Sequence, residues 1–150
     1  MTDTPTVICD LDGTLCNIDH RLHYLKENKD WDTFYDNCDK DKPNLWCVKI
    51  LESLANSGVN IVFVSGRRSS TWDKTTKWFH DNLPVKVWLG RELYMRQDGD
   101  YRKDCVIKKE IFDEHLTERN ILFALDDRQQ VVDMWRKQGL VCLQVAKGDF

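Results

Sequence analysis

Two aspartates at the end of a short apolar stretch are the residues that most clearly indicate chemistry. Asp10 and Asp12 follow the apolar residues 7–9 and precede Gly13, where the strand is expected to end. With a spacing of two, both side chains would point to one face of a straight strand. Like charges this close raise the pKa of at least one carboxyl group unless a cation is present. The alternative is a tight turn, in which aspartate bonds its own backbone and glycine supplies the positive φ.

Polar residues also follow two later apolar stretches. One stretch ends in Ser65-Gly66-Arg67 and the other in Asp126-Asp127. Taken alone, the first run is typical of a turn and helix cap, and the second complements the dipole of a following helix. The carboxyl ends of parallel strands meet at one edge of a sheet, so we expect all three groups to converge there. Their convergence predicts an active site.

A lysine on a predicted helix supplies positive charge to this edge. Asp104 and Lys108 are four residues apart, a spacing that an exposed helical ion pair would also explain. Lys109 and Lys103 are the other candidates. Lys108 is preferred because of its spacing from Asp104.

The alternation of apolar stretches and helical patterns predicts an α/β fold with a doubly wound parallel sheet. We expect strands at residues 6–10, 60–64, 85–89, 120–125 and 140–145. Helices are expected between Pro43 and Gly58 and at about 69–81, 104–116 and 128–138, with 90–103 irregular or a small hairpin. The polar, aromatic segment 16–42 is expected to form two short helices that cap the site.

Composition excludes several classes of protein. The chain has 150 residues, 41% hydrophobic and 31% charged, which is typical of one globular domain, here residues 1–150. No apolar run could span a membrane, and residues 1–6 lack the pattern of a signal peptide, so we expect a cytoplasmic location. The net charge of -3 does not fit a protein that coats duplex DNA. The six cysteines are scattered without zinc-ligand spacing, so we expect reduced thiols.

The run Asp10-Leu11-Asp12-Gly13-Thr14-Leu15 resembles the first motif of the haloacid dehalogenase (HAD) superfamily of aspartate-nucleophile phosphatases. The resemblance implies a HAD-like Rossmannoid fold with strand order 5-4-1-2-3, a cap inserted after the first strand, and a lysine on the helix of Lys108. It also implies that Asp10 attacks phosphorus to form an aspartyl-phosphate. Asp12, protonated because of crowding by Asp10, would serve as the acid and then the base.

A phosphate monoester is close to a dianion, and a carboxylate must attack it. Unit charges about 4 Å apart repel by about 4 kcal/mol at an effective dielectric constant near 20. A hard divalent cation is therefore expected, and oxygen ligands with phosphate suit Mg²⁺. Its expected ligands are Asp10, the backbone carbonyl of Asp12, and Asp127 or Asp126. The residues expected to bind phosphate are Thr14, Ser65, Gly66 and Lys108.

Longer segments resemble the 3′-phosphatase half of the T-even bacteriophage polynucleotide kinase/phosphatase family. They are residues 102–112, 126–136 and 144–150, together with Val64-Ser65-Gly66-Arg67. The resemblance implies removal of a 3′-phosphate from DNA or RNA ends in nucleic-acid repair, and action on 2′,3′-cyclic phosphate ends. It places functional positions at Asp10, Asp12, Arg21, Arg67, Asp104, Lys108, Asp126 and Asp127, with Asp41 a weaker match.

Within that resemblance, Arg21 and Arg67 are expected to contact the phosphates of the substrate strand, because a guanidinium group binds phosphate bidentately. A solvated surface charge is the alternative for Arg21. Trp31, Phe34 and Tyr35 could stack on a terminal base, although packing between cap helices is the preferred interpretation.

Two features depart from the family. The sequence has no GxxxxGK[ST] loop, so the chain is not the kinase half. We expect either a stand-alone phosphatase or a fragment of a longer protein. A separate or fused kinase or ligase is the expected partner. The segment 22–34 is longer than in the family, so the cap differs. The alternatives are a small-molecule phosphatase of the superfamily, such as a 5′(3′)-nucleotidase, and a non-catalytic phosphate-binding module.

Overall fold

A five-stranded parallel sheet forms the centre of the molecule. The computed structural model describes residues 3–150, so the first two residues of the N-terminal stretch considered above lie outside it. The strand order is β5-β4-β1-β6-β7, and every neighbouring pair is parallel. The strands are β1 (Thr6–Cys9), β4 (Asn60–Arg68), β5 (Glu92–Arg96), β6 (Ile121–Arg128) and β7 (Cys142–Gly148). The predicted α/β class is confirmed. The predicted order 5-4-1-2-3 is confirmed as well, because it numbers only the five strands of this sheet in chain order and is read from the opposite edge, starting at β7.

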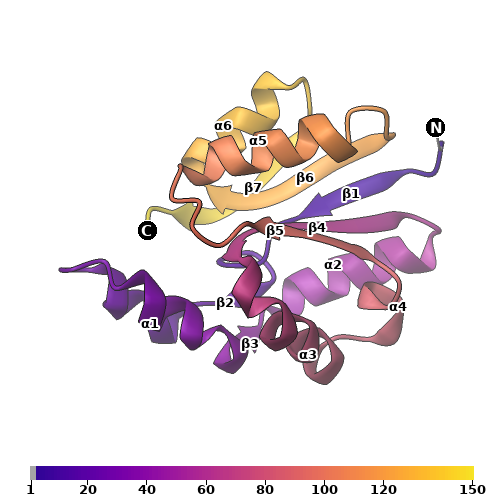
Figure 1. The fold of residues 1–150 in the computed structure, drawn as a ribbon. Coiled ribbons are helices and arrows are strands. Elements are labelled where there is room, and N and C mark those ends of the chain that lie inside the picture. Colours follow the sequence, from indigo (N-terminus) through magenta and orange to yellow (C-terminus); the bar gives the residue numbers. More distant parts are fainter. Residues whose placement is uncertain (1–2) are drawn as a thin grey trace.

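Helices cover both faces of the sheet (Figure 1). One face carries α2 (Leu45–Asn56), α3 (Trp72–Asn82) and the short α4 (Val85–Trp88), and the other carries α5 (Asp104–His115) and α6 (Gln129–Lys137). The central strand β1 is buried throughout and contributes to both cores: Val7 and Cys9 face α2 and α3, whereas Ile8 faces α5 and α6. This alternation explains its continuous apolar sequence.

The third predicted strand was wrong. Residues 85–89 form α4 and its cap, and the strand is β5, in the segment expected to be irregular. Val87 is buried and Trp88 packs against the same core, while Val85 is 59% exposed and Leu89 is 61% exposed, so the residues of this run do not alternate as in a strand. Leu93, in contrast, is buried and lies opposite Phe63 of β4. A short apolar run cannot by itself distinguish a strand from a helical turn.

The segment between β1 and α2 forms a small helical insertion. It contains the 3-10 helices η1 (Asp19–Leu25) and η2 (Cys38–Lys40) and the helix α1 (Trp31–Asp36). Its two ends pair as the antiparallel strands β2 (Cys16–Asn17) and β3 (Lys42–Pro43). Ile18, Leu25 and Phe34 form its own core. The expectation of a largely helical insertion here is confirmed, with the two-stranded pair as an addition.

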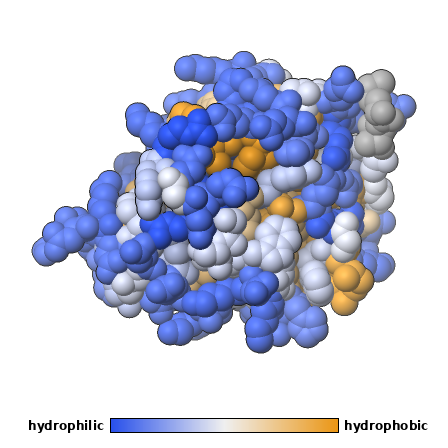
Figure 2. Space-filling model, viewed as in Figure 1, coloured by the Kyte–Doolittle hydropathy of each residue, from blue (hydrophilic) through white to orange (hydrophobic). Residues whose placement is uncertain are grey.

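The remaining observations agree with the composition. All six cysteines are free thiols. Among the described residues, no helix is long and apolar enough to cross a membrane. The face seen in Figure 2 is mainly hydrophilic, with apolar side chains confined to small areas.

Candidate active site

Three strand ends bring the predicted polar residues to one edge of the sheet. Asp10 directly follows β1, Ser65 lies in the second half of β4, and Asp126 and Asp127 lie near the end of β6. The side chain of Lys108 reaches the same edge from the second turn of α5. All five of these residues are buried. The convergence expected from parallel topology is therefore present in the structure.

Lys108, Asp10, Asp126 and Asp127 form one compact group, hereafter the lysine cluster. Lys108 Nζ lies 2.7 Å from Asp10 Oδ1 and 3.0 Å from Asp126 Oδ2, and Asp104 Oδ2 is 3.6 Å away. Burial lowers the pKa of Lys108, but the neighbouring carboxylates more than compensate and raise it well above its ordinary value. The lysine is thus a fixed positive charge.

The two aspartates of β6 differ in how well they are bonded. Asp126 accepts hydrogen bonds from Lys108 Nζ, Trp135 Nε1 and the backbone N–H groups of Asp127 and Arg128. In contrast, Oδ1 of Asp127 is buried and has no hydrogen-bond partner among the described residues. An unbonded buried carboxylate oxygen is costly unless a cation contacts it. Asp127 is therefore the better of the two predicted metal ligands.

The lysine cluster carries excess negative charge. Burial and the nearby Asp126 raise the pKa of Asp10 well above its ordinary value and that of Asp127 to about 6. Carboxylate oxygens of Asp10, Asp126 and Asp127 lie within 4.8 Å of one another. Three carboxylates around one lysine, with an unbonded oxygen among them, fit a divalent cation.

Asp12, Asp41, Arg21 and Arg67 form a second group, hereafter the arginine cluster. Asp12 Oδ1 accepts from Arg21 Nη2 at 2.7 Å and from Arg67 Nε at 2.9 Å. Asp41 Oδ2 accepts from the same two side chains at 2.6 and 3.0 Å. Asp41 belongs to the segment that closes the insertion, whereas Arg67 belongs to β4. The cluster thus joins the insertion to the sheet.

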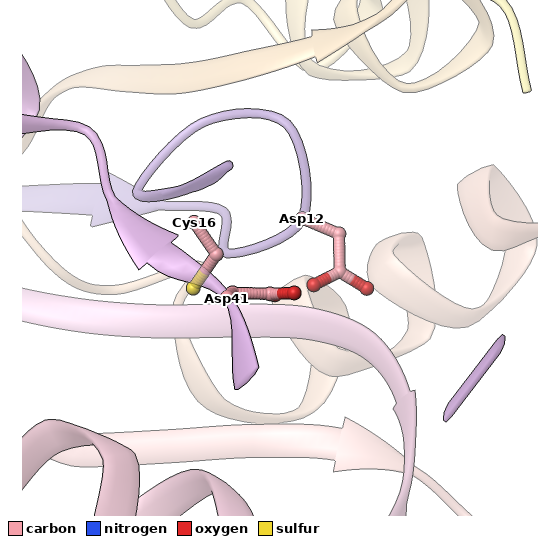
Figure 3. A group of neighbouring side chains, drawn as sticks. All are labelled: Asp12, Cys16 and Asp41. Carbon is pink, nitrogen blue, oxygen red and sulfur yellow. The ribbon is translucent and has the colours of Figure 1, made fainter. Parts of the chain in front are cut away.

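Figure 3 shows that the carboxylates of Asp12 and Asp41 point toward each other, with the Cys16 thiol close by. These three groups have the spacing of a metal site. Arg21 and Arg67 already supply two positive charges to the two carboxylates. Burial also raises the pKa of Cys16 well above its ordinary value, which disfavours the thiolate. The arginines therefore take the place that a cation would fill.

The protonation expected for Asp12 was wrong. Burial alone would raise the pKa of Asp12, but Arg21 and Arg67 together outweigh it and lower that pKa to about 2. The sequence argument assumed that Asp10 would be the dominant neighbour. In the structure Asp12 faces the two arginines, so it is ionised at neutral pH.

The placement of the arginines also corrects an expectation. The side chains of Arg21 and Arg67 are 0% exposed, and their guanidinium groups bond Asp12 and Asp41. Arg21 further donates to the Phe34 carbonyl oxygen, and its guanidinium lies 4.1 Å from the centre of the Phe34 ring. Arg21 is therefore not a solvated surface charge. Neither arginine faces the surface, where a substrate strand would contact it.

Hydroxyl groups and glycines complete the site. Thr14 Oγ1 donates to Asp10 Oδ2 at 3.0 Å, and Ser65 Oγ accepts from the backbone N–H of Arg67. A Cβ atom on Gly66 would lie 2.0 Å from Asp104 Oδ1. Gly13 has a φ of 82°, and a Cβ there would lie 2.1 Å from Asp127 Oδ2. Both glycines therefore allow aspartates to approach the backbone closely.

Several supporting residues were missed in the sequence. Trp135 bonds Asp126 from the apolar face of α6, where only a core role was apparent. Arg96 donates to the Gly66 carbonyl oxygen at 3.0 Å, and Tyr35 Oη donates to the same oxygen at 3.2 Å. His20 Nε2 lies 2.6 Å from Asp41 Oδ1. No motif in the sequence identifies these side chains, because their hydrogen-bond partners are backbone atoms or residues that are distant in the sequence.

The other two lysines do not reach the site. Lys103 and Lys109 are both exposed, and Lys109 pairs with Asp113 on its own helix. The aromatic residues of the insertion pack against one another, with ring centres of Trp31 and Phe34 5.6 Å apart and those of Phe34 and Tyr35 5.4 Å apart. Packing was the preferred interpretation for these rings.

Comparison with known proteins gives consistent matches. The family model described as the polynucleotide kinase PNKP phosphatase domain matches residues 4–150. A protein of Autographa californica nuclear polyhedrosis virus that carries the name of a bifunctional polynucleotide kinase/RNA ligase is 30% identical over 132 residues, which cover 87% of this chain and 17% of the viral protein. The HAD fold implies a divalent metal, in agreement with the lysine cluster.

Solved structures agree. A chain of the Pnkp1/Rnl/Hen1 RNA repair complex has a TM-score of 0.82 and 34% identity, covering 98% of this chain and 44% of that one. The class C acid phosphatase from Bacillus anthracis shares the HAD fold, with a TM-score of 0.64 and 16% identity over 87% of this chain and 54% of its own. The chain thus spans less than half the length of the viral and repair-complex relatives that it matches.

Proposed function

Because this chain belongs to the family of polynucleotide kinase PNKP phosphatase domains, we propose that it is a Mg²⁺-dependent polynucleotide 3′-phosphatase. It removes the 3′-phosphate of DNA or RNA ends, and acts on 2′,3′-cyclic phosphate ends. The observation that supports this most is that Asp10, a carboxylate held by Lys108, lies beside Asp127, whose buried Oδ1 has no hydrogen-bond partner within residues 3–150. That combination suits the transfer of a phosphoryl group to a carboxylate.

In the first step, Asp10 attacks phosphorus in line and the bond to the 3′ oxygen breaks. Thr14 and Lys108 each bond one oxygen of Asp10 and so fix the direction of attack. Lys108 also offsets charge on the phosphoryl oxygens, and the Ser65 hydroxyl donates to one of them. Asp12, which is ionised in the free protein, takes up a proton from solvent when the dianionic substrate binds beside it, because that added negative charge opposes the effect of the two arginines. Asp12 then gives this proton to the leaving 3′ oxygen.

In the second step, water attacks the aspartyl-phosphate and Asp10 is released as a carboxylate. Asp12 takes the proton of that water. Arg21 and Arg67 hold Asp12 in the ionised form that a general base requires, which their effect on its pKa supports. In this proposal the arginines act on the strand indirectly, by setting the position and charge of Asp12.

Mg²⁺ would be held by the carboxylates of Asp10 and Asp127 and by the backbone carbonyl of Asp12. When bound, it neutralises charge on the attacking carboxylate and the phosphoryl oxygens. Asp126 supports the site by bonding Lys108 and the backbone of its own turn. Asp104 and Asp41 have supporting roles, since they contact Lys108 and the two arginines.

The relatives suggest the setting of the reaction. One matching chain is part of a complex with Rnl and Hen1 in RNA repair, and the viral relative is named as a kinase joined to a ligase. We propose that a separate or fused kinase or ligase acts with this phosphatase. A 3′-hydroxyl is the group that a ligase needs at one side of a break, so the product suits such a partner.

Phosphate release tests the proposal. The purified protein is given Mg²⁺ and matched DNA and RNA oligonucleotides that carry a 3′-phosphate, a 5′-phosphate or a 2′,3′-cyclic phosphate, beside a 3′-mononucleotide. We expect phosphate from the 3′-phosphorylated strands, none from the 5′-phosphorylated ones, and none in the presence of a chelator. Release from the mononucleotide alone would favour a small-molecule phosphatase, and release from no substrate would favour a non-catalytic module.

A further inference from the structure

A groove leads away from the cavity of the lysine cluster along the insertion. It encloses about 180 Å³. Trp31, Tyr35, Asp104 and Arg128 line both the groove and the cavity that contains Asp10 and Asp127, so the two are continuous. We call this groove the strand groove. The lining side chains used in the argument below are Trp31, Tyr35, Arg68, Tyr101 and Lys103.

Aromatic rings form the wall on the side of the insertion. Trp31 and Tyr35 are nearly parallel, with ring centres 5.8 Å apart and planes 25° from each other. Tyr35 is fixed to the site by the hydrogen bond from its hydroxyl to the Gly66 carbonyl oxygen. The guanidinium of Arg68 lies 5.2 Å from the centre of the Tyr35 ring and 6.0 Å from that of Tyr101. Such rigid π surfaces suit stacking with a nucleobase.

The opposite wall is a loop with an anchored backbone and an exposed ring. Arg96 donates to the carbonyl oxygens of Asp100 and Arg102, and Arg102 pairs with Asp100 and Glu110. Tyr101, between these tied residues, is 83% exposed. Because the exposed Tyr101 ring contributes little to the core, its position on an anchored loop suggests that it contacts a ligand.

Charge distinguishes this groove from the other opening of the site. Five cationic and two acidic residues line the strand groove and its rim: Arg68, Arg96, Arg102, Lys103 and Arg128 against Asp100 and Asp104. The second opening, beside Trp46 and Phe150, has Lys147 against Asp19, Asp127 and Asp149. All four arginines are paired with acids, two of which, Asp32 and Glu110, lie outside the groove lining, whereas Lys103 has no ion pair among the described residues. The strand groove is therefore more attractive to a polyanion than the second opening, mainly through Lys103.

We propose that the strand groove holds the last nucleotides of a single-stranded polynucleotide whose 3′-phosphate lies at Asp10. One base stacks on the exposed ring of Tyr101, and the next backbone phosphate lies near Lys103 and Arg68, whose guanidinium lies over the Tyr35 and Tyr101 rings. This inference rests on the proposed function and adds the surface that distinguishes a polynucleotide end from a mononucleotide.

The test compares kcat/KM for a 3′-phosphorylated hexanucleotide, as DNA and as RNA, with kcat/KM for a 3′-mononucleotide. We expect the wild-type protein to prefer the hexanucleotide. Tyr101→Ser should lower the ratio of the two values by about tenfold, mainly through KM, because stacking on one ring is lost. Lys103→Ala should lower the ratio less, and its effect should shrink as salt increases. The matched controls are Trp46→Ser and Lys147→Ala in the second opening, which should keep the wild-type ratio.

The outcomes separate this inference from the proposed function. Equal ratios in the wild-type, Tyr101→Ser and Lys103→Ala proteins would overturn the strand groove but leave the 3′-phosphatase intact. A lower ratio in the Trp46→Ser or Lys147→Ala controls would place the strand in the second opening and also overturn it. A wild-type protein that acts on neither substrate would overturn the proposed function, and this inference with it.

Discussion

The two buried clusters at the sheet edge contain similar acids but different counter-charges. In the lysine cluster, Lys108 bonds two of the three carboxylates, Asp10 and Asp126, and the third, Asp127, has an Oδ1 without a hydrogen-bond partner among the described residues. In the arginine cluster, two carboxylates share two guanidinium groups that bond both of them. The pKa of Asp127 is raised to about 6, mainly by burial, whereas that of Asp12 is lowered to about 2 by its arginines against the effect of burial.

This difference shows that counter-charge, and not the number of acids, decides where a cation is needed. A guanidinium group has five donors in a rigid plane and can bond two carboxylates at once, whereas an ammonium is a compact charge. The lysine cluster therefore leaves negative charge over for a metal and a nucleophile. The arginine cluster is closed to a metal, even though Asp12, Cys16 and Asp41 have suitable spacing.

The largest effect is expected from Asp10→Asn, which removes the nucleophile from the lysine cluster. The amide keeps the shape of the side chain, so the fold should survive while phosphate release falls by more than about a thousandfold. Phosphate release from a 3′-phosphorylated oligonucleotide measures the loss, and circular dichroism checks the fold. Activity near that of the wild-type protein would contradict the role of Asp10.

Arg67→Met tests whether the arginine cluster is structural. Removing one partner of a buried ion pair leaves an uncompensated charge, which costs roughly 3–5 kcal/mol. Urea unfolding should show a loss of that size. Arg102→Met is the matched control, because its side chain is 50% exposed although it pairs with two acids. Its loss should be much smaller than that of Arg67→Met, because exposed ion pairs contribute little to stability, and equal losses for the two variants would show that burial is not decisive.

Mg²⁺ should stabilise the protein through the lysine cluster, and more at pH 7.5 than at pH 5. The folded-state pKa of Asp127, about 6, is above its ordinary value of 3.8, so without metal its contribution to stability is present below about pH 4 and is lost as the pH rises through 6. Mg²⁺ restores stability where the proton has left, by about 2.7 kcal/mol at a hundredfold excess over Kd.

Thermal melting with and without Mg²⁺ measures this effect. Asp127→Asn should remove most of the Mg²⁺-dependent shift, because it removes the carboxylate with the unbonded oxygen. Asp41→Asn, in the arginine cluster, should keep it. A shift that persists in Asp127→Asn and disappears in Asp41→Asn would reverse the assignment of the two clusters.

The smallest effect is expected from His20→Gln at the rim of the arginine cluster. His20 bonds Asp41 Oδ1, but its side chain is 38% exposed, and exposed pairs of this kind are worth about 1 kcal/mol or less. Urea unfolding should therefore show a loss well below that of Arg67→Met. A loss as large as that of Arg67→Met would mean that His20 is an essential part of the cluster.

The contacts of the lysine cluster could be predicted from the sequence, whereas the family resemblance named the members of the arginine cluster without predicting that they bond one another. Asp10 and Asp127 each follow an apolar stretch, and parallel topology alone brings such positions together. Lys108 was identifiable from its helical spacing to Asp104. In the arginine cluster, Arg21 and Asp41 belong to a polar insertion without a regular period. Their burial depends on how that insertion returns to the sheet, which no local pattern specifies.

The same distinction applies to the fold. The strand β1 and the helices α2 and α5 fall close to their predicted positions. The third strand was misplaced because residues 85–89 and 92–96 are both short and partly apolar. Only packing against Phe63 of β4 decides between them, through Leu93. Tertiary contact overrides local preference in such short runs.

The antiparallel pair β2–β3 joins the two ends of the insertion to each other, and the arginine cluster fastens the insertion to the five-stranded sheet. Cys16 pairs with Pro43 in the backbone, while the side chain of Arg21 donates to both Asp12 and Asp41, and Arg67 of β4 also donates to Asp41. If the insertion moved as a hinged lid, it would have to break buried ion pairs each time it opened, so we expect it to stay in place over the site. Substitutions in the insertion that change substrate preference are therefore constrained, because Arg21 and Asp41 belong to the insertion and Arg21 also sets the charge of Asp12.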